Sequence, residues 1–169
     1  MTGRVRSASV TAMLTWGEFA AARPDAAATG RAMLYQFGVG LGFLGTVRAD
    51  GGPRVHPVCP ILTDDGLYLF VVASPKRTDL RRDPRYALHA FPTDANEDAF
   101  YLTGEAEAKA DAALRARIAQ QYLMVEREMT EEPQGFDDEQ LFELRVSTCL
   151  TTKTTGHGDW NPQHTVWKA

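Results

Sequence analysis

Apolar and polar residues alternate between Leu41 and Ala73, and this period of two predicts β-strands. The segment reads LGFLGTVRADGGPRVHPVCPILTDDGLYLFVVA, and the turn sequences ADGG and TDDG divide it into three strands. Pro57 and Pro60 cannot donate backbone hydrogen bonds, so the second strand is expected to be an edge strand or to be interrupted. The third strand, LYLFVVA, is apolar on both faces and is therefore expected in the centre of the sheet.

Further strands are predicted at RYALHAF, around DAFYLTGEAEA, and at LFELRVSTCLTTKT and HTVWKA. A first helix is predicted at TWGEFAAARPD, where Thr15 and Glu18 have the spacing of a capping box. A second should close at Gly38, and a third should run from Asp111 to about Tyr122. Many short strands separated by turns favour an antiparallel barrel over a parallel doubly wound sheet. The predicted class is mainly β (α+β), an antiparallel barrel with flanking helices.

The chain has 169 residues, of which 44% are hydrophobic and 24% charged, as expected for one globular domain. We expect this domain to span residues 14–169, after a disordered, Ser/Thr-rich lead-in over residues 1–13. A formal net charge of -4 argues against nucleic-acid binding. No apolar run is long enough to cross a membrane and no signal-peptide pattern is present, so a cytoplasmic location is expected. Cys59 and Cys149 indicate neither a disulfide framework nor a metal site.

The stretch SPKRTDLRRDP, residues 74–84, predicts a short helix directly after a buried strand. Ser74 is a favoured N-cap, Pro75 is favoured at the first helical position, and Asp83 before Pro84 ends the helix. The first-turn N–H groups point outward at the positive end of the helix dipole. With the Ser74 hydroxyl and the Lys76 ammonium they form a candidate phosphate site. A capped surface helix with solvated arginines explains the same residues, so this stretch alone leaves both interpretations open.

With its flanks included, the stretch resembles the pyridoxamine 5′-phosphate oxidase-like, flavin-binding split-barrel superfamily. The residues that carry the resemblance are FLGTVRADGGPRVHPV followed by DGLYLFVVASPKRTDLRRDPRYALHAF. It covers roughly residues 41–107, and the C-terminal strands more loosely. It implies a homodimer of antiparallel split β-barrels, with flavin in a groove at the subunit interface.

The resemblance also assigns cofactor contacts to particular positions. It implies that Ser74, Lys76 and Arg77 hold the cofactor phosphate. The strand 54–58 would run beside the isoalloxazine ring, the segment 71–73 would contact the ring and ribityl chain, and a C-terminal aromatic residue would lie near the cofactor. The implied binding residues are Arg54, Val55, His56, Pro57, Val58, Val71, Val72, Ala73, Ser74, Lys76, Arg77 and Trp167. No metal site is predicted, and His56 is the first candidate for a catalytic residue.

The sequence departs from that of true pyridoxamine-phosphate oxidases at two places. Those enzymes carry a C-terminal motif with arginine and histidine that grips the substrate phosphate, whereas this chain has no arginine after Arg145. Pro75 stands where an arginine often precedes the phosphate lysine. Oxidation of vitamin B6 is therefore not expected, and the pattern is more similar to the flavin/deazaflavin oxidoreductase branch. We expect an FMN-dependent oxidoreductase that transfers hydride to or from a small organic substrate.

Two alternatives stay open. The deazaflavin F420, in its reduced form, could be the hydride donor instead, with Arg81, Arg82 and Arg85 binding its polyglutamate tail. The same barrel could also be a non-enzymatic flavin or haem carrier, with His157 and His164 as a candidate ligand pair.

Three further features have simpler interpretations. Trp160 is expected to be a core or interface anchor, with stacking on a cofactor ring as the alternative. His89 is expected in the core or at a dimer interface. The acidic run 126–139 is expected to be a solvated loop.

Overall fold

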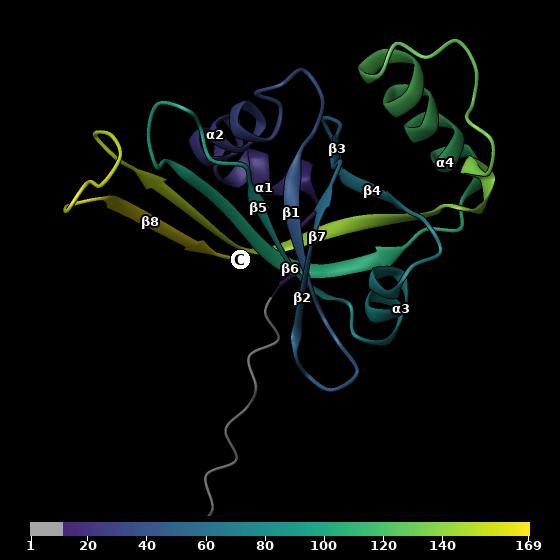
Figure 1. Ribbon diagram of the computed structural model, residues 1–169, viewed down its shortest axis with the longest axis horizontal. Helices are drawn as coiled ribbons and strands as arrows, with labels where there is room; N and C mark the ends of the chain where they lie inside the picture. Colours follow the sequence, from purple (N-terminus) through teal and green to yellow (C-terminus); the bar gives the residue numbers. More distant parts are fainter. Residues whose placement is uncertain (1–11) are drawn as a thin grey trace, which may run out of the picture.

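Eight antiparallel strands form one curled sheet in the computed structural model, which describes residues 12–169 (Figure 1). Seven strands follow one another across the sheet in the order β2-β1-β5-β6-β7-β4-β3, and β8 pairs with β7. The strands are β1 Gly42–Val47, β2 Pro53–Val58, β3 Ile61–Leu62, β4 Leu67–Val71, β5 Arg85–Ala90, β6 Ala99–Ala108, β7 Gln140–Lys153 and β8 Gln163–Lys168. The expectation of an antiparallel β architecture with flanking helices is confirmed. The lead-in predicted over residues 1–13 lies mostly outside the described residues.

Helices flank the sheet at three places (Figure 1). The α-helices are α1 Trp16–Ala22, α2 Pro24–Leu34, α3 Pro75–Arg82 and α4 Ala112–Ala119, with a π-helical segment η1 Gln120–Glu126 and a 3₁₀ turn η2 Phe136–Asp138. The predicted capping box is present, because the Thr15 hydroxyl accepts from the Glu18 N–H and the Glu18 carboxylate accepts from the Thr15 N–H. Among the described residues, no helix combines the length and apolar character needed to cross a membrane.

The long strand β7 belongs to two parts of the molecule. One edge pairs with β6 along most of its length. On the other edge, residues 140–143 pair with β4, whereas residues 148–153 pair with β8. The first half of β7 therefore closes the curled sheet, and its second half forms a hairpin with β8 that extends from the sheet (Figure 1).

The prediction of a central position for LYLFVVA is wrong. This strand, β4, lies second from one end of the sheet and is followed only by the two-residue β3. It is apolar on both faces because the helical segment α4–η1 covers the side opposite the main core. On that side Tyr68 packs in a second buried cluster with Ile61, Ile118 and Leu141. The expectation of an edge strand around residues 56–60 is confirmed, since β2 begins the sheet order.

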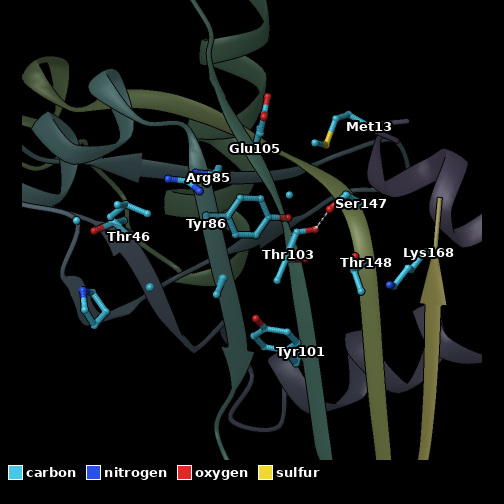
Figure 2. Close-up of a pocket in the computed structure, with 16 residues that line it drawn as sticks. Met13, Thr46, Arg85, Tyr86, Tyr101, Thr103, Glu105, Ser147, Thr148 and Lys168 are labelled. Atoms are coloured by element: carbon cyan, nitrogen blue, oxygen red, sulfur yellow. Dashed lines mark hydrogen bonds between the residues drawn. The ribbon is translucent and has the colours of Figure 1, made fainter. Parts of the chain in front are cut away.

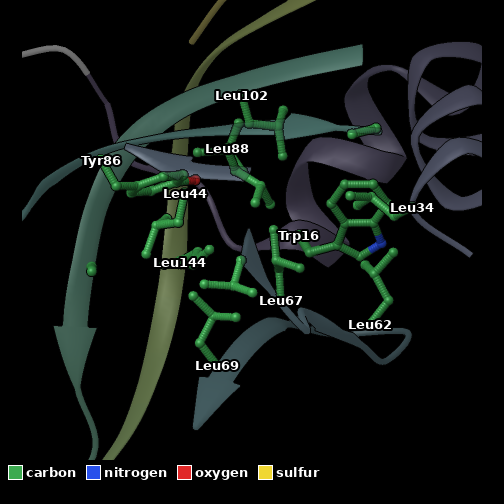
Figure 3. Close-up of a cluster of buried hydrophobic side chains, with 14 of the residues drawn as sticks. Trp16, Leu34, Leu44, Leu62, Leu67, Leu69, Tyr86, Leu88, Leu102 and Leu144 are labelled. Carbon is green, nitrogen blue, oxygen red and sulfur yellow. The ribbon is translucent and has the colours of Figure 1, made fainter. Parts of the chain in front are cut away.

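The main core lies between one face of the sheet and the helices α1 and α2. Trp16 and Leu34 from these helices meet Leu44, Leu88 and Leu102 from three neighbouring strands (Figure 3). These strand residues are fully buried, so their face of the sheet is the inner one. The residues that alternate with them must point to the opposite face.

Helix α2 ends at Leu34, four residues earlier than the expected end at Gly38. Gly30 lies inside this helix for a steric reason: a Cβ atom at this position would overlap the ring of Phe100 on β6. An alanine is normally about 1 kcal/mol better than glycine in a helix. Here the close approach of helix and sheet reverses that preference.

We therefore expect Gly30→Ala to destabilise the protein by about 1–3 kcal/mol, the usual cost of overpacking a core. The free energy of unfolding in urea measures this effect. Ala28→Gly, at an exposed position of the same helix, is the control and should lose no more than about 1 kcal/mol. A Gly30→Ala variant as stable as the unmodified protein would contradict this account.

Candidate functional site

Helix α3 begins where the sequence predicts, but the side chain of its N-cap residue, Ser74, does not cap it. Ser74 occupies the N-cap position with extended backbone, and its hydroxyl donates instead to the carbonyl of Val72 at 2.9 Å. No side chain among the described residues accepts from the first-turn N–H groups of α3. Those groups therefore remain available to an anion at the positive end of the helix dipole.

The two basic residues of this first turn behave differently. Arg77 Nη1 donates to the carbonyl of Asp138 at 2.7 Å and so ties α3 to the segment before β7. Lys76 is half-buried and has no hydrogen-bond or ion-pair partner within residues 12–169. Burial raises the pKa of the nearby Glu139 carboxyl, and the charges of Arg115 and Lys76 offset part of that rise. Lys76 is thus the cation of this turn that is free to meet a ligand.

A buried carboxylate, Asp79, holds α3 against the β1–β2 hairpin. Its side chain is 5% exposed and accepts from Arg54 Nε at 2.7 Å and from the Thr46 hydroxyl at 3.0 Å. Arg82 lies 3.4 Å from its second oxygen and also donates to the carbonyl of Val47. Burial alone would raise the pKa of Asp79, but the hydrogen bonds from Arg54 and Thr46 outweigh it and the pKa lies below its ordinary value of 3.8. Asp79 is ionised at neutral pH.

A groove of about 500 Å³ lies between α3 and the turn that joins β1 to β2. Arg54 contributes to it from β2, and Pro75 and Thr78 contribute from the first half of α3. Arg48 and Arg82 also line it, each beside a carboxylate of the same groove, Asp50 and Asp79 respectively. The structure therefore brings together Arg54 and the start of α3, two of the segments that the sequence assigned to a cofactor.

Strand β2 presents alternate residues to the two faces of the sheet. Arg54 and His56 are half-buried and Val58 is buried, whereas Val55 and Pro57 on the other face are exposed. The Nε2 atom of His56 is buried and has no hydrogen-bond partner among the described residues. A buried imidazole nitrogen without a partner is costly, and a ligand group that bonds to it would remove that cost.

The remaining predicted contacts fall in two places. Val71 is buried at the end of β4, and Val72 and Ala73 are exposed just before α3. Trp167 lies elsewhere: it pairs with Cys149 on β7, and its ring packs 5.2 Å from that of Phe19 on α1. Arg81 of α3 contacts β7 at Gln140, nine residues before Cys149, a contour of roughly 30 Å along one strand. Within one chain Trp167 and the start of α3 do not meet.

The outer face of the sheet carries a row of residues that spans six strands. Register pairs Pro57 with Phe43, Phe43 with His89, His89 with Tyr101, Tyr101 with Leu150, and Leu150 with Val166. Phe43 is 40% and Val166 54% exposed. His89 lies on this outer face and is partly exposed, so it is not a core residue. Of the two positions expected from the sequence, the dimer interface remains. We call these six residues the outer row.

Beside the outer row lies a groove of about 630 Å³. Figure 2 shows Tyr101, Thr103, Thr148 and Lys168 on neighbouring strands at this groove, with the Ser147 hydroxyl bonded to the Thr103 carbonyl at 3.0 Å. Gly45 and Ala87 also line it and leave space at its floor, because their side chains are small or absent. Sequence reasoning missed this surface, since it depends on the register of strands far apart in the chain.

The acidic run 126–139 is only partly the solvated loop that the sequence predicts. Residues 130–135 are exposed or nearly so, but Glu126 ends η1 and turns inward. Its carboxylate accepts from the Tyr35 hydroxyl at 2.9 Å, and this hydroxyl in turn accepts from the Leu62 N–H at 2.8 Å. Burial raises the pKa of Glu126 and also raises that of Tyr35. These groups join α2, β3 and η1, so their arrangement has a structural purpose.

The two cysteines and the two C-terminal histidines do not assemble into a site. Cys59 is half-exposed near Arg127, whereas Cys149 is buried and burial raises the pKa of its thiol to about 11. His157 contacts the carbonyl of Asp94 at 3.1 Å, and His164 contacts the Thr152 hydroxyl at 2.9 Å. Within residues 12–169, no three His, Cys, Asp or Glu side chains are grouped closely enough to hold a metal ion.

Solved structures from several bacteria share this fold. A haem-binding protein from Mycobacterium smegmatis superposes with a TM-score of 0.58 at 20% identity, covering 85% of this chain and 58% of its own. This chain thus spans little more than half the length of that protein. A Clostridium acetobutylicum protein related to general stress protein 26, of the pyridoxinephosphate oxidase family, has a TM-score of 0.63 at 13% identity over 83% and 92% of the two chains. HutZ, the haem storage protein of Vibrio cholerae, has a TM-score of 0.54 at 15% identity over 69% and 87%.

At these identities the solved structures establish the fold alone. No curated protein matches the sequence. The sequence profile described as Pyridoxamine 5′-phosphate oxidase matches residues 36–153, which include β1 to β7 and all of α3. The chain therefore belongs to the pyridoxamine 5′-phosphate oxidase family of split β-barrels, as its sequence resemblance implied.

Proposed function

We propose that this protein is a flavin-dependent oxidoreductase that binds FMN beside α3 and β2. The observation that carries the proposal is the uncapped first turn of α3 with its unpaired Lys76, next to the groove lined by Arg54. Family membership supports the choice of a flavin, and when bound the flavin would supply hydride-transfer chemistry for a small organic substrate.

The phosphate end of the cofactor has a suitable set of donors. The backbone N–H groups of Lys76 and Arg77 lie at the positive end of the helix, and the Lys76 ammonium adds a full charge. The Ser74 hydroxyl is bonded to Val72 but can rotate to donate to a phosphate oxygen. Arg54 keeps its salt bridge to Asp79, which fixes its guanidinium at the edge of the groove.

The ring end would lie along β2 and the end of β4. Within residues 12–169, edge strand β2 has no neighbouring strand on one side, so its backbone groups there can bond to the polar rim of a ring. The unpartnered Nε2 of His56 faces inward from this strand. We propose His56 as the residue that hydrogen-bonds the cofactor or holds a proton for the substrate. Val72 and Ala73 would provide apolar contact.

We also propose that the working form is a homodimer. The outer row is largely apolar and partly exposed, and the charged residues of the same face, Arg85, Glu105, Arg145 and Lys168, lie in neighbouring rows. The outer row suits a second copy, because two such uncharged rows can meet without like-charge repulsion. A dimer would also give Trp167 a route to a cofactor, since within one chain it pairs with Cys149, nine residues along β7 from the Gln140 that α3 contacts.

F420 is the weaker cofactor candidate, because the arginines proposed for its tail already have partners. Arg81 bonds to Gln140, Arg82 to Asp79 and Arg85 to Asp83. Haem is the second candidate, favoured by the haem-binding proteins among the structures that share the fold. His157 and His164 would then have to leave their present contacts to bind iron.

The absorbance spectrum of the purified protein, followed by titration with FMN, F420 and haemin, tests the proposal. We expect a flavin spectrum or tight FMN binding, with reduction of the bound flavin by a nicotinamide donor. A Soret band with no affinity for FMN would favour the haem alternative. If the protein binds F420 and not FMN, the deazaflavin would replace FMN as the proposed cofactor.

A further inference from the structure

One aromatic side chain of the described structure is completely exposed to solvent. Trp160 lies in the connection between β7 and β8, and it is 100% exposed. A tryptophan in water exposes one of the largest apolar surfaces of any residue and is usually buried or at an interface. The core position expected as one role of this residue is therefore wrong, and the roles of interface anchor and ring-stacking group remain.

The connection that carries Trp160 is held in place by two carboxylates. The carboxylate of Asp159 accepts from the N–H groups of Thr155 and Asn161, each at 2.8 Å. At the base of the connection, the carboxylate of Asp98 accepts from the Thr154 N–H at 2.7 Å and pairs with Lys153 at 2.8 Å. The tryptophan is thus presented to solvent by a braced turn, which lowers the entropy cost of docking it.

The hairpin below Trp160 continues the outer row. Leu150 and Val166 face each other across β7 and β8, at the end of that row, and both remain partly or largely exposed. Figure 1 shows the hairpin extending from the rest of the sheet as an arm. The exposed outer row thus extends onto a projecting hairpin, and such a hairpin can pack around a second molecule.

We propose that the β7–β8 hairpin clasps a second copy of this chain, with Trp160 as the anchor that is buried against that copy's sheet face. This inference rests on the homodimer of the proposed function and adds the residue that supplies most of its affinity. The outer row carries no charged side chain and ends on the arm with Leu150 and Val166, so an identical row can receive these two residues without burying an unpaired charge. In a two-fold dimer each copy would contribute one arm and receive the other.

Sedimentation velocity over a range of protein concentrations tests the clasp. For Trp160→Ala we expect the dimer dissociation constant to rise about 30-fold or more, as for a hot-spot residue. The control is Val125→Ala, which truncates another exposed apolar side chain, 62% exposed, on η1 and away from the outer row. That variant should change the dissociation constant less than about threefold. Equal behaviour of the two variants would overturn the proposal.

A second readout follows the fluorescence of Trp160 in the unmodified protein and uses the conservative variant Trp160→Phe only as the reference. The difference in emission between the unmodified protein and Trp160→Phe isolates Trp160 from Trp16 and Trp167. We expect this emission to be shielded from acrylamide in the dimer and to become accessible on dilution. Free quenching of Trp160 in a sample that sedimentation shows to be dimeric would overturn the clasp.

The same measurements separate this inference from the proposed function. If the protein binds FMN and its dimer is unaffected by Trp160→Ala, the inference about Trp160 is wrong and the proposed function stands. A chain that stays monomeric at all concentrations would overturn the clasp and the dimer, whatever its FMN affinity. Shielding of Trp160 in the monomer only on addition of phosphatidylglycerol vesicles would overturn the second copy as its occupant and assign it to a lipid surface.

Discussion

Replacing Asp79 by asparagine is expected to destabilise the protein by about 3 kcal/mol, near the lower end of the range for breaking a buried ion pair. The carboxylate is 5% exposed and serves Arg54, Thr46 and Arg82 at once. Asparagine keeps the shape but leaves both guanidinium groups without a counter-charge. The loss falls at the lower end because Arg54 and Arg82 are 30% and 38% exposed and can recover part of their hydration.

Urea unfolding followed by circular dichroism at fixed protein concentration measures this loss as a lower midpoint with an unchanged slope. Asp50→Asn is the matched control, because Asp50 pairs with Arg48 only 2.7 Å away but is 60% exposed. Its loss should stay below about 1 kcal/mol. If both variants lose the same small amount, Asp79 does not hold α3 to the β1–β2 hairpin.

The contribution of Asp79 should also depend on pH. Its pKa in the folded protein lies below the ordinary value of 3.8, so the folded state binds this proton less tightly than the unfolded state does. The stabilisation is therefore complete above pH 3.8 and is lost as the pH falls through the lower, folded pKa. The gap in stability between the unmodified protein and Asp79→Asn should close in that acidic range and stay constant from pH 5 to 8.

How far the sequence could predict these features depends on whether the signals are local. The bounds of α3 follow from neighbouring residues, Ser74 and Pro75 at its start and Asp83 before Pro84 at its end, and the structure agrees. The network of Asp79 could not be predicted in the same way. The spacing of Asp79 and Arg82 hints at an ion pair, but Arg54 and Thr46 lie 25 and 33 residues away and come close only through the fold.

Burial and position are also easily confused in a sequence. The apolar run of β4 showed correctly that both faces are covered, but helices rather than further strands cover one of them. The outer row, in contrast, was not predicted at all. Its members include His89 and Tyr101, which look unremarkable one at a time, and only the pairing of six strands lines them up. Long-range register is what sequence patterns do not contain.

Within residues 12–169, Lys76 is the one unpaired cation of the proposed phosphate site. Lys76→Ala is therefore expected to weaken FMN binding by about 1–3 kcal/mol, or roughly 5- to 150-fold in dissociation constant. Lys76 has no hydrogen-bond or ion-pair partner among the described residues, so its removal breaks no such interaction and should leave the fold intact. Quenching of FMN fluorescence on titration with protein measures the affinity. Riboflavin, which lacks the phosphate, should bind the variant and the unmodified protein equally.

Arg81→Ala is the matched control for Lys76→Ala. It removes the same charge from the same helix, but Arg81 is near the last turn and bonds to Gln140 of β7. If the field of the whole helix attracted the phosphate, both variants would lose similar affinity, and both losses would fade with salt. A direct contact predicts a loss for Lys76→Ala alone that persists at high ionic strength. Equal losses for FMN and riboflavin would instead show that Lys76 acts on the shape of the site, and the phosphate would have to bind elsewhere.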